Sequence, residues 1–278
     1  MDFEHEYNNR ARVPEWTDIS ADWRARSARL RGEVAAADLG IPYGSTRRQT
    51  LDILWPDTGR DAPVVLYIHG GYWQYGHPRD VTFAAEGCLA HGVAVALPGY
   101  DLAPDVPLST ILAELRAAAV TLHHRVRRRL AVAGHSAGGH LAAALTATSW
   151  HTLDTRGPDD LVTGGVGISG VYEVEPLIHT SINDKLRLSA EEATRLSPAL
   201  WDVPAGRSFA AFAGGAESDE FRRQAHDLAT VWTAKGLPTQ AHEVAGANHF
   251  TVVEQMADPA SLMVERLVAA AREAAGRG

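Results

Sequence analysis

The stretch that most constrains the fold is residues 130–140, an apolar run that ends abruptly in glycines around one serine. It predicts a buried strand, a sharp turn and a helix, in that order. Ser136 stands at the turn in the pattern Gly-x-Ser-x-Gly, between Gly134 and Gly138. This is the nucleophile-elbow pattern, in which a strained turn presents a serine hydroxyl above the edge of a sheet. So short a motif can arise by chance, and its context must therefore support it.

The rest of the chain alternates between buried strands and helices. We expect strands at 35–41, 49–55, 64–68, 93–97, 162–169, 208–213 and 239–244, and helices at 80–90, 107–122, 220–235 and 255–274. Such alternation predicts an α/β fold with a mostly parallel twisted sheet and helices on both faces, in a single domain over residues 1–278. Residues 1–32 are predicted to form an N-terminal arm that packs on this domain.

The strand pattern is interrupted once, at residues 171–207, which predicts a small helical insertion over the site, a candidate lid. Ligands bind outside the carboxyl ends of the strands in sheets of this kind. The glycine-rich breaks after residues 68, 133 and 213, and the loop after residue 244, all fall on that edge. A site built from these loops is therefore expected.

Composition narrows the classes of partner. The formal net charge of -8 argues against nucleic acid or an anionic membrane as the main partner. No apolar run approaches a membrane span, and the acidic start of the chain lacks a secretory-type apolar segment, so we expect a cytoplasmic protein. The basic cluster at residues 125–129 is expected to cap a helix end. Cys88 is the only cysteine and is expected to be a buried core thiol. We expect no metal and no cofactor.

A serine nucleophile needs a histidine to take its proton and a carboxylate to orient that histidine. His249 follows the last predicted strand in a loop, whereas His226 falls within a surface helix and His242 within that strand. For the acid we favour Glu217, immediately beyond the strand that ends in glycines at 214 and 215. Asp219, two residues further on, stays the alternative.

The negative oxygen that develops during attack on a carbonyl needs backbone N–H donors. Ala137 follows the nucleophile and supplies one donor. The loop after residue 68 supplies the other donors, which we assign to Gly71 and Tyr72. We expect the further histidines near these motifs, His69, His135 and His140, to brace loops by hydrogen bonds rather than to titrate in the reaction.

The chain resembles the α/β-hydrolase-type kynurenine formamidases, also called arylformamidases. The resemblance rests on His69-Gly70-Gly71-Tyr72-Trp73 and on the elbow, and extends to Tyr7-Asn8-Asn9-Arg10, Ile168-Ser169-Gly170-Val171-Tyr172, the residues after Glu217, and Asn248-His249-Phe250. The segment Tyr100-Asp101-Leu102-Ala103-Pro104 is instead similar to hormone-sensitive-lipase-like esterases. Where many family members have aspartate this chain has Glu217, which keeps Asp219 open.

The resemblance implies Ser136 as nucleophile, His249 as base, and hydrolysis of N-formyl-L-kynurenine to L-kynurenine and formate. The aromatic leaving group would then rest against Tyr72, Trp73 or the insertion. A homodimer is a further implication. Two alternatives remain at this point: a general carboxylesterase acting on short-chain or aryl esters with the same machinery, and a catalytically silent relative that binds a ligand or a partner.

Overall fold

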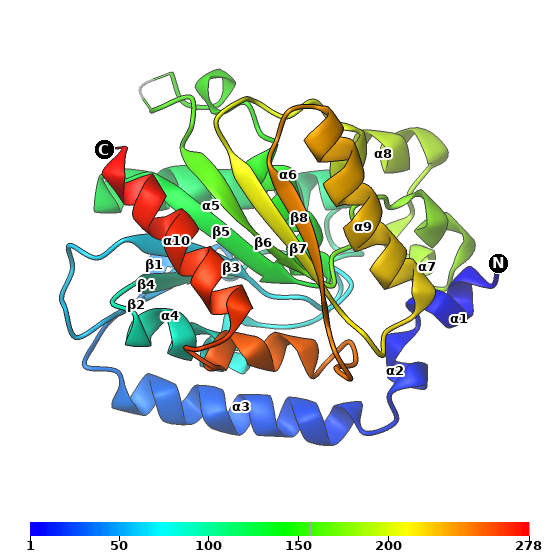
Figure 1. The fold of residues 1–278 in the computed structure, drawn as a ribbon, viewed down its shortest axis with the longest axis horizontal. Helices are drawn as coiled ribbons and strands as arrows, with labels where there is room; N and C mark the ends of the chain where they lie inside the picture. Colours follow the sequence, from blue (N-terminus) through cyan, green and yellow to red (C-terminus); the bar gives the residue numbers. More distant parts are fainter. Residues whose placement is uncertain (156, 278) are drawn as a thin grey trace.

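The computed structural model describes residues 1–155 and 157–277 and is built on one eight-stranded sheet (Figure 1). The spatial order is β1-β2-β4-β3-β5-β6-β7-β8. The strands span Ala36–Pro42, Thr50–Trp55, Val64–Ile68, Ala94–Pro98, Leu130–His135, Val162–Ile168, Ser208–Gly214 and Thr239–Val244, from β1 to β8. β2 pairs antiparallel with β1 and β4, and every other pair is parallel. The predicted mostly parallel sheet is confirmed.

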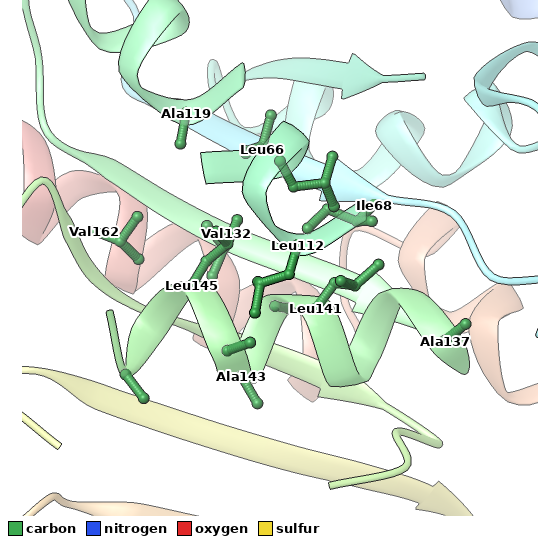
Figure 2. Packing of buried hydrophobic residues seen from close by; sticks show 14 of the residues in the cluster. Leu66, Ile68, Leu112, Ala119, Val132, Ala137, Leu141, Ala143, Leu145 and Val162 are labelled. Carbon is green, nitrogen blue, oxygen red and sulfur yellow. The ribbon is translucent and has the colours of Figure 1, made fainter. Parts of the chain in front are cut away.

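Helices cover both faces of the sheet, as expected. One face carries α5 (Leu108–Val126), α6 (Ala137–Thr146) and α9 (Asp219–Ala234). The other carries α3 (Trp16–Glu33), α4 (Glu86–Ala90) and α10 (Leu262–Gly276), and Figure 1 shows α10 crossing in front of the sheet. Figure 2 shows the packing on the first face, where leucines and alanines of α5 and α6 meet Leu66, Ile68, Val132 and Val162 of the central strands.

Two predicted helices differ from those observed. The chain at 80–90 forms two 3-10 turns, η1 (Pro78–Asp80) and η2 (Thr82–Ala85), before α4 begins. The Phe83 N–H donates to the Ser27 hydroxyl of α3 (3.0 Å). This N–H therefore bonds to a neighbouring helix and not to a carbonyl within a regular helix of its own. The predicted helix at 255–274 is also divided, into η6 (Val252–Ala257) and α10, because Pro259 lacks the N–H that a continuous helix needs.

The N-terminal arm consists of α1 (Phe3–Tyr7), α2 (Asn9–Arg12) and α3. Its anchor is Tyr7, whose buried hydroxyl donates to Glu220 (2.7 Å) and accepts from the Gln224 side chain (2.9 Å), both on α9. The insertion at 171–207 contains η4 (Glu175–His179), α7 (Asn183–Leu186), α8 (Ala190–Arg195) and η5 (Pro198–Leu200). Its predicted helical character is therefore observed.

Two further predictions concern structural residues. The basic cluster lies at the end of α5, where Arg125 pairs with Asp38 (3.0 Å) and Arg129 with Asp160 (2.6 Å). Cys88 is fully buried, and burial raises the pKa of its thiol to about 12. Within residues 1–155 and 157–277, no helix combines the length and the apolar character that crossing a membrane requires.

Candidate active site

The elbow lies between β5 and α6 and holds Ser136 in a strained conformation with positive φ, at φ 57° and ψ −120°. The Ser136 N–H donates to the Ile168 carbonyl of β6 (2.7 Å), which fixes the turn to the neighbouring strand. A Cβ on Gly138 would overlap the carbonyl oxygen of Ile68 in β3. The motif needs glycine there because three backbone segments meet at the base of the turn.

His249 lies beside the elbow serine, in the loop after β8. Its Nε2 is 3.0 Å from the Ser136 hydroxyl and its Nδ1 is 2.8 Å from Glu217 Oε2. The loop is held by Asn248, whose side-chain oxygen accepts from the N–H groups of Phe250 and Thr251, at 2.9 Å each. Serine, histidine and carboxylate thus form a continuous hydrogen-bonded chain, and all three are buried.

Glu217 is fixed on its other side as well. Its Oε1 accepts from the Gly214 N–H (2.6 Å) and from the hydroxyl of Ser169, which directly follows β6. The Glu217 side chain is 0% exposed, whereas the Asp219 side chain is 86% exposed and pairs with Arg222 on α9 (3.3 Å). The structure therefore places Glu217, and not Asp219, at His249.

Three other histidines near the site brace loops, as the sequence predicts. His135 Nε2 lies 2.7 Å from the His249 carbonyl, and burial lowers the pKa of His135 to about 3. His140 Nε2 lies 2.7 Å from the Leu196 carbonyl, with a pKa lowered to about 4 by burial. Burial also lowers the pKa of His69, to about 3. All three rings are neutral at neutral pH.

The predicted oxyanion donors flank the serine. Gly70 lies so close that a Cβ on it would come within 2.7 Å of the His135 carbonyl and 3.0 Å of the Ser136 Cβ. Within the described part of the chain, the N–H groups of Gly71, Tyr72 and Ala137 donate to no acceptor. These three donors are therefore available to a ligand oxygen.

Trp73 does not lie where the sequence predicts. It is 1% exposed, faces the core and packs edge-on against His140, with 5.1 Å between ring centroids. The cause is the turn after β3, in which the N–H groups of Gln74 and Tyr75 both donate to the Gly71 carbonyl (2.9 Å each). The expectation that Trp73 binds substrate is therefore wrong. Tyr72 lines the pocket at Ser136, and its hydroxyl also holds the arm, donating to the Tyr7 carbonyl (3.1 Å).

A cavity of about 210 Å³ opens at Ser136 and His249. Three aromatic rings, those of Trp16, Trp23 and Phe250, line one side of it. The ring centroid of Phe250 lies 6.4 Å from that of Trp16 and 6.1 Å from that of Trp23. The arm thus supplies much of the lining, and the insertion at 171–207 supplies none of it. The arm's part in the lining was not predicted, although two aromatic and two basic residues, Tyr7, Arg10, Arg12 and Trp16, lie within ten positions and were the available signal.

The chain was compared with known proteins. Residues 65–253 match the family model described as alpha/beta hydrolase fold. A kynurenine formamidase of Salmo salar is 31% identical over 240 residues, which is 83% of this chain and 80% of that protein. An esterase of Mycobacterium tuberculosis is 37% identical over 126 residues, covering 41% of this chain and 38% of its own length.

A solved structure from Silicibacter sp. TM1040, provisionally assigned as a thioesterase, superposes with a TM-score of 0.85. It is 30% identical and covers 96% of this chain and 99% of its own. The matched region contains the elbow, Glu217 and His249. This protein is a hydrolase, and the chain belongs to the alpha/beta hydrolase family as a relative of the kynurenine formamidases.

Proposed function

We propose that the chain hydrolyses the formamide bond of N-formyl-L-kynurenine, releasing L-kynurenine and formate. The observation that carries this proposal is an aromatic cavity that opens directly on the hydrogen-bonded Ser136, His249 and Glu217. The hydrogen-bonded residues suit acyl transfer, and the aromatic side suits an aniline leaving group. Similarity to kynurenine formamidases supports the choice of substrate.

In the proposed first step, the Ser136 hydroxyl attacks the formyl carbon while His249 Nε2 takes its proton. Glu217 holds the Nδ1–H of His249, so that Nε2 presents a lone pair to the serine and the resulting imidazolium is stabilised. The N–H groups of Gly71, Tyr72 and Ala137 hold the developing oxyanion. Free N–H groups suit this role because they need no rearrangement as charge forms.

In the second step, His249 gives its proton to the aniline nitrogen as the C–N bond breaks, which leaves a formyl ester on Ser136. Water, activated by the same histidine, then hydrolyses this ester to formate. The Gly70 backbone packs closely against His135 and Ser136 at the elbow.

A carboxylesterase acting on short-chain or aryl esters is the second candidate, because the same residues would cleave an ester and an esterase is among the relatives. The two are separated by measuring kcat/KM for N-formyl-L-kynurenine beside p-nitrophenyl acetate and a short-chain thioester. We expect the formamide to be the best substrate. Markedly better turnover of the ester or the thioester would overturn the formamidase proposal.

Two expectations remain as predictions, the cytoplasmic location and the homodimer. Light scattering of the purified protein tests the second.

A further inference from the structure

We propose that the mouth of the cavity binds the α-amino acid group of the substrate as a zwitterion, with Arg10 holding the carboxylate and Asp80 the ammonium. This inference rests on the proposed function and adds the basis of its substrate selectivity. Two charged side chains line the cavity, and within residues 1–155 and 157–277 neither of them forms an ion pair.

Arg10, on α2, is held by aromatic rings. Its guanidinium carbon lies 4.5 Å from the ring centroid of Trp16 and 4.7 Å from that of Tyr75. Contacts of this kind use the flat faces of the guanidinium and leave its N–H edges free. No carboxylate in residues 1–155 or 157–277 forms an ion pair with it. A guanidinium without a carboxylate partner in a cavity fits a ligand carboxylate, which it can bind through hydrogen bonds.

The backbone around Arg10 is fixed to the predicted oxyanion loop. The Asn9 N–H donates to the Tyr72 hydroxyl (3.1 Å), and Asn8 caps α2 by accepting from the Ala11 N–H (3.2 Å). The position of Arg10 relative to the reacting bond is therefore set before substrate binds. Preorganisation of this kind reduces the entropy lost on binding.

The surface beside Arg10 carries both signs of charge, with Lys185 as a second cation and Glu4 and Asp184 as carboxylates. Lys185 Nζ lies 4.6 Å from the ring centroid of the same Tyr75 and donates to its hydroxyl (2.8 Å). Two cations thus share one ring.

Asp80, at the end of η1, lines the same cavity and is half-buried. Across the described residues no lysine, arginine or histidine forms an ion pair with it, although Arg24 is also in the lining. A carboxylate and a guanidinium that share a cavity without neutralising each other match a ligand that carries both charges. An α-amino acid is such a ligand, and a simple ester is not.

The test uses three substrates: N-formyl-L-kynurenine, its decarboxylated analogue and its deaminated analogue. Replacing Arg10 by alanine should lower kcat/KM for N-formyl-L-kynurenine by about 10- to 100-fold, mainly through KM. The decarboxylated analogue should lose less than about 3-fold, since it has no group for Arg10 to bind. Asp80→Asn should also lower kcat/KM for N-formyl-L-kynurenine. It should spare the deaminated analogue instead, since that analogue has no ammonium group for Asp80 to bind.

Arg12→Ala is the matched control, because Arg12 lies on the same short helix but outside the lining of this cavity, with its guanidinium 2.8 Å from His5 Nε2. It should leave the ratio of kcat/KM values between the three substrates unchanged. Equal losses on all three substrates in the Arg10 variant would overturn the inference, as would a selective loss in Arg24→Ala instead.

A separate measurement keeps this inference distinct from the proposed function. If the wild-type protein fails to cleave N-formyl-L-kynurenine, the proposed function is wrong. The zwitterion site can then be tested alone, by measuring how L-kynurenine inhibits the hydrolysis of p-nitrophenyl acetate. Arg10→Ala should then raise the inhibition constant by about 10-fold or more. Equal inhibition of wild type and variant, or no inhibition of either, would refute the zwitterion site. Thermal melting and fluorophosphonate labelling verify that each variant is folded.

Discussion

Replacing Glu217 by glutamine changes one atom of the proposed triad and should reverse the tautomer of His249. The two oxygens of Glu217 differ in their partners. Oε1 accepts from the Gly214 N–H and the Ser169 hydroxyl, and Oε2 accepts from His249 Nδ1. The amide oxygen of glutamine will occupy the Oε1 position, because the flipped amide would leave the buried Gly214 N–H unsatisfied at a cost of about 1–3 kcal/mol.

The amide NH₂ group therefore faces His249 Nδ1, which must become an acceptor. The ring proton then moves to Nε2, 3.0 Å from the Ser136 hydroxyl, and the histidine no longer accepts the serine proton. Loss of the correct tautomer lowers turnover by about 10⁴-fold, or about 5 kcal/mol of transition-state stabilisation. The fold should persist because the variant keeps the size and shape of the buried side chain.

The assay is kcat for the preferred substrate, measured beside Asp219→Asn as the matched control. Asp219 is exposed and pairs with Arg222, so its variant should keep kcat within about 2-fold of the native value, the size expected for an exposed site. The reasoning is refuted if Glu217→Gln keeps more than a tenth of native turnover, or if Asp219→Asn loses as much. Near-equal melting temperatures exclude unfolding as the cause.

Three further variants test other parts of the site. Ser136→Ala should abolish fluorophosphonate labelling and lower turnover by about 10⁴-fold or more, and surviving label would contradict the elbow assignment. Gly70→Ala should lower kcat by about 10²-fold, seen in single turnover, because its Cβ would press on the His135 carbonyl at 2.7 Å and shift the serine. Burial lowers the pKa of His140 to about 4, so the unfolded chain binds more protons as pH falls below about 6.5. Stability should fall by about 2 kcal/mol between pH 7 and pH 5 from this residue alone, and His140→Gln should remove that part of the pH dependence of urea unfolding. An unchanged pH dependence in the variant would show that His140 titrates normally.

The strand pattern of the sequence predicted the sheet because buried parallel strands are continuous apolar runs, as in β3 and β5. The two divided helices were predicted as single elements for a different reason. Their periodicity is helical, but the break after η2 depends on a tertiary hydrogen bond to Ser27, which no local pattern reports. The break before α10 had a local signal, Pro259, followed by the N-cap Ser261.

Motif order was enough to predict the three hydrogen-bonded groups Ser136, Glu217 and His249, because each lies in the turn or loop that follows a strand. The walls of the cavity were not predictable in the same way. Trp73 follows the oxyanion loop in sequence, yet the turn at Gly71 directs its ring into the core. Arg10 and Trp16 lie far from the elbow in sequence and reach it only because Tyr7 and Asn9 fix the arm, through contacts with α9 and Tyr72.

Backbone strain is concentrated at the candidate site. Six non-glycine residues in the described chain have positive φ, and two of them, Arg127 and Arg187, end helices, where this conformation is common. The other four are Tyr72 (φ 56°), Trp73 (57°), Ser136 (57°) and Ser169 (48°), and all follow parallel strands at the site. Each such residue costs about 1–3 kcal/mol relative to a relaxed backbone.

Glycine would relieve this strain at all four positions, so the side chains that remain there must be useful. The Ser136 hydroxyl faces His249, the Ser169 hydroxyl binds Glu217, and the Tyr72 hydroxyl fixes the arm that carries Arg10. Trp73 fills the core beneath the turn. The strained residues therefore join the elbow, the acid and the arm, and the arrangement of the cavity mouth depends on the same loop that supplies the proposed oxyanion donors. In the proposed binding mode, a single short segment of backbone therefore aligns a substrate held at the mouth with Ser136.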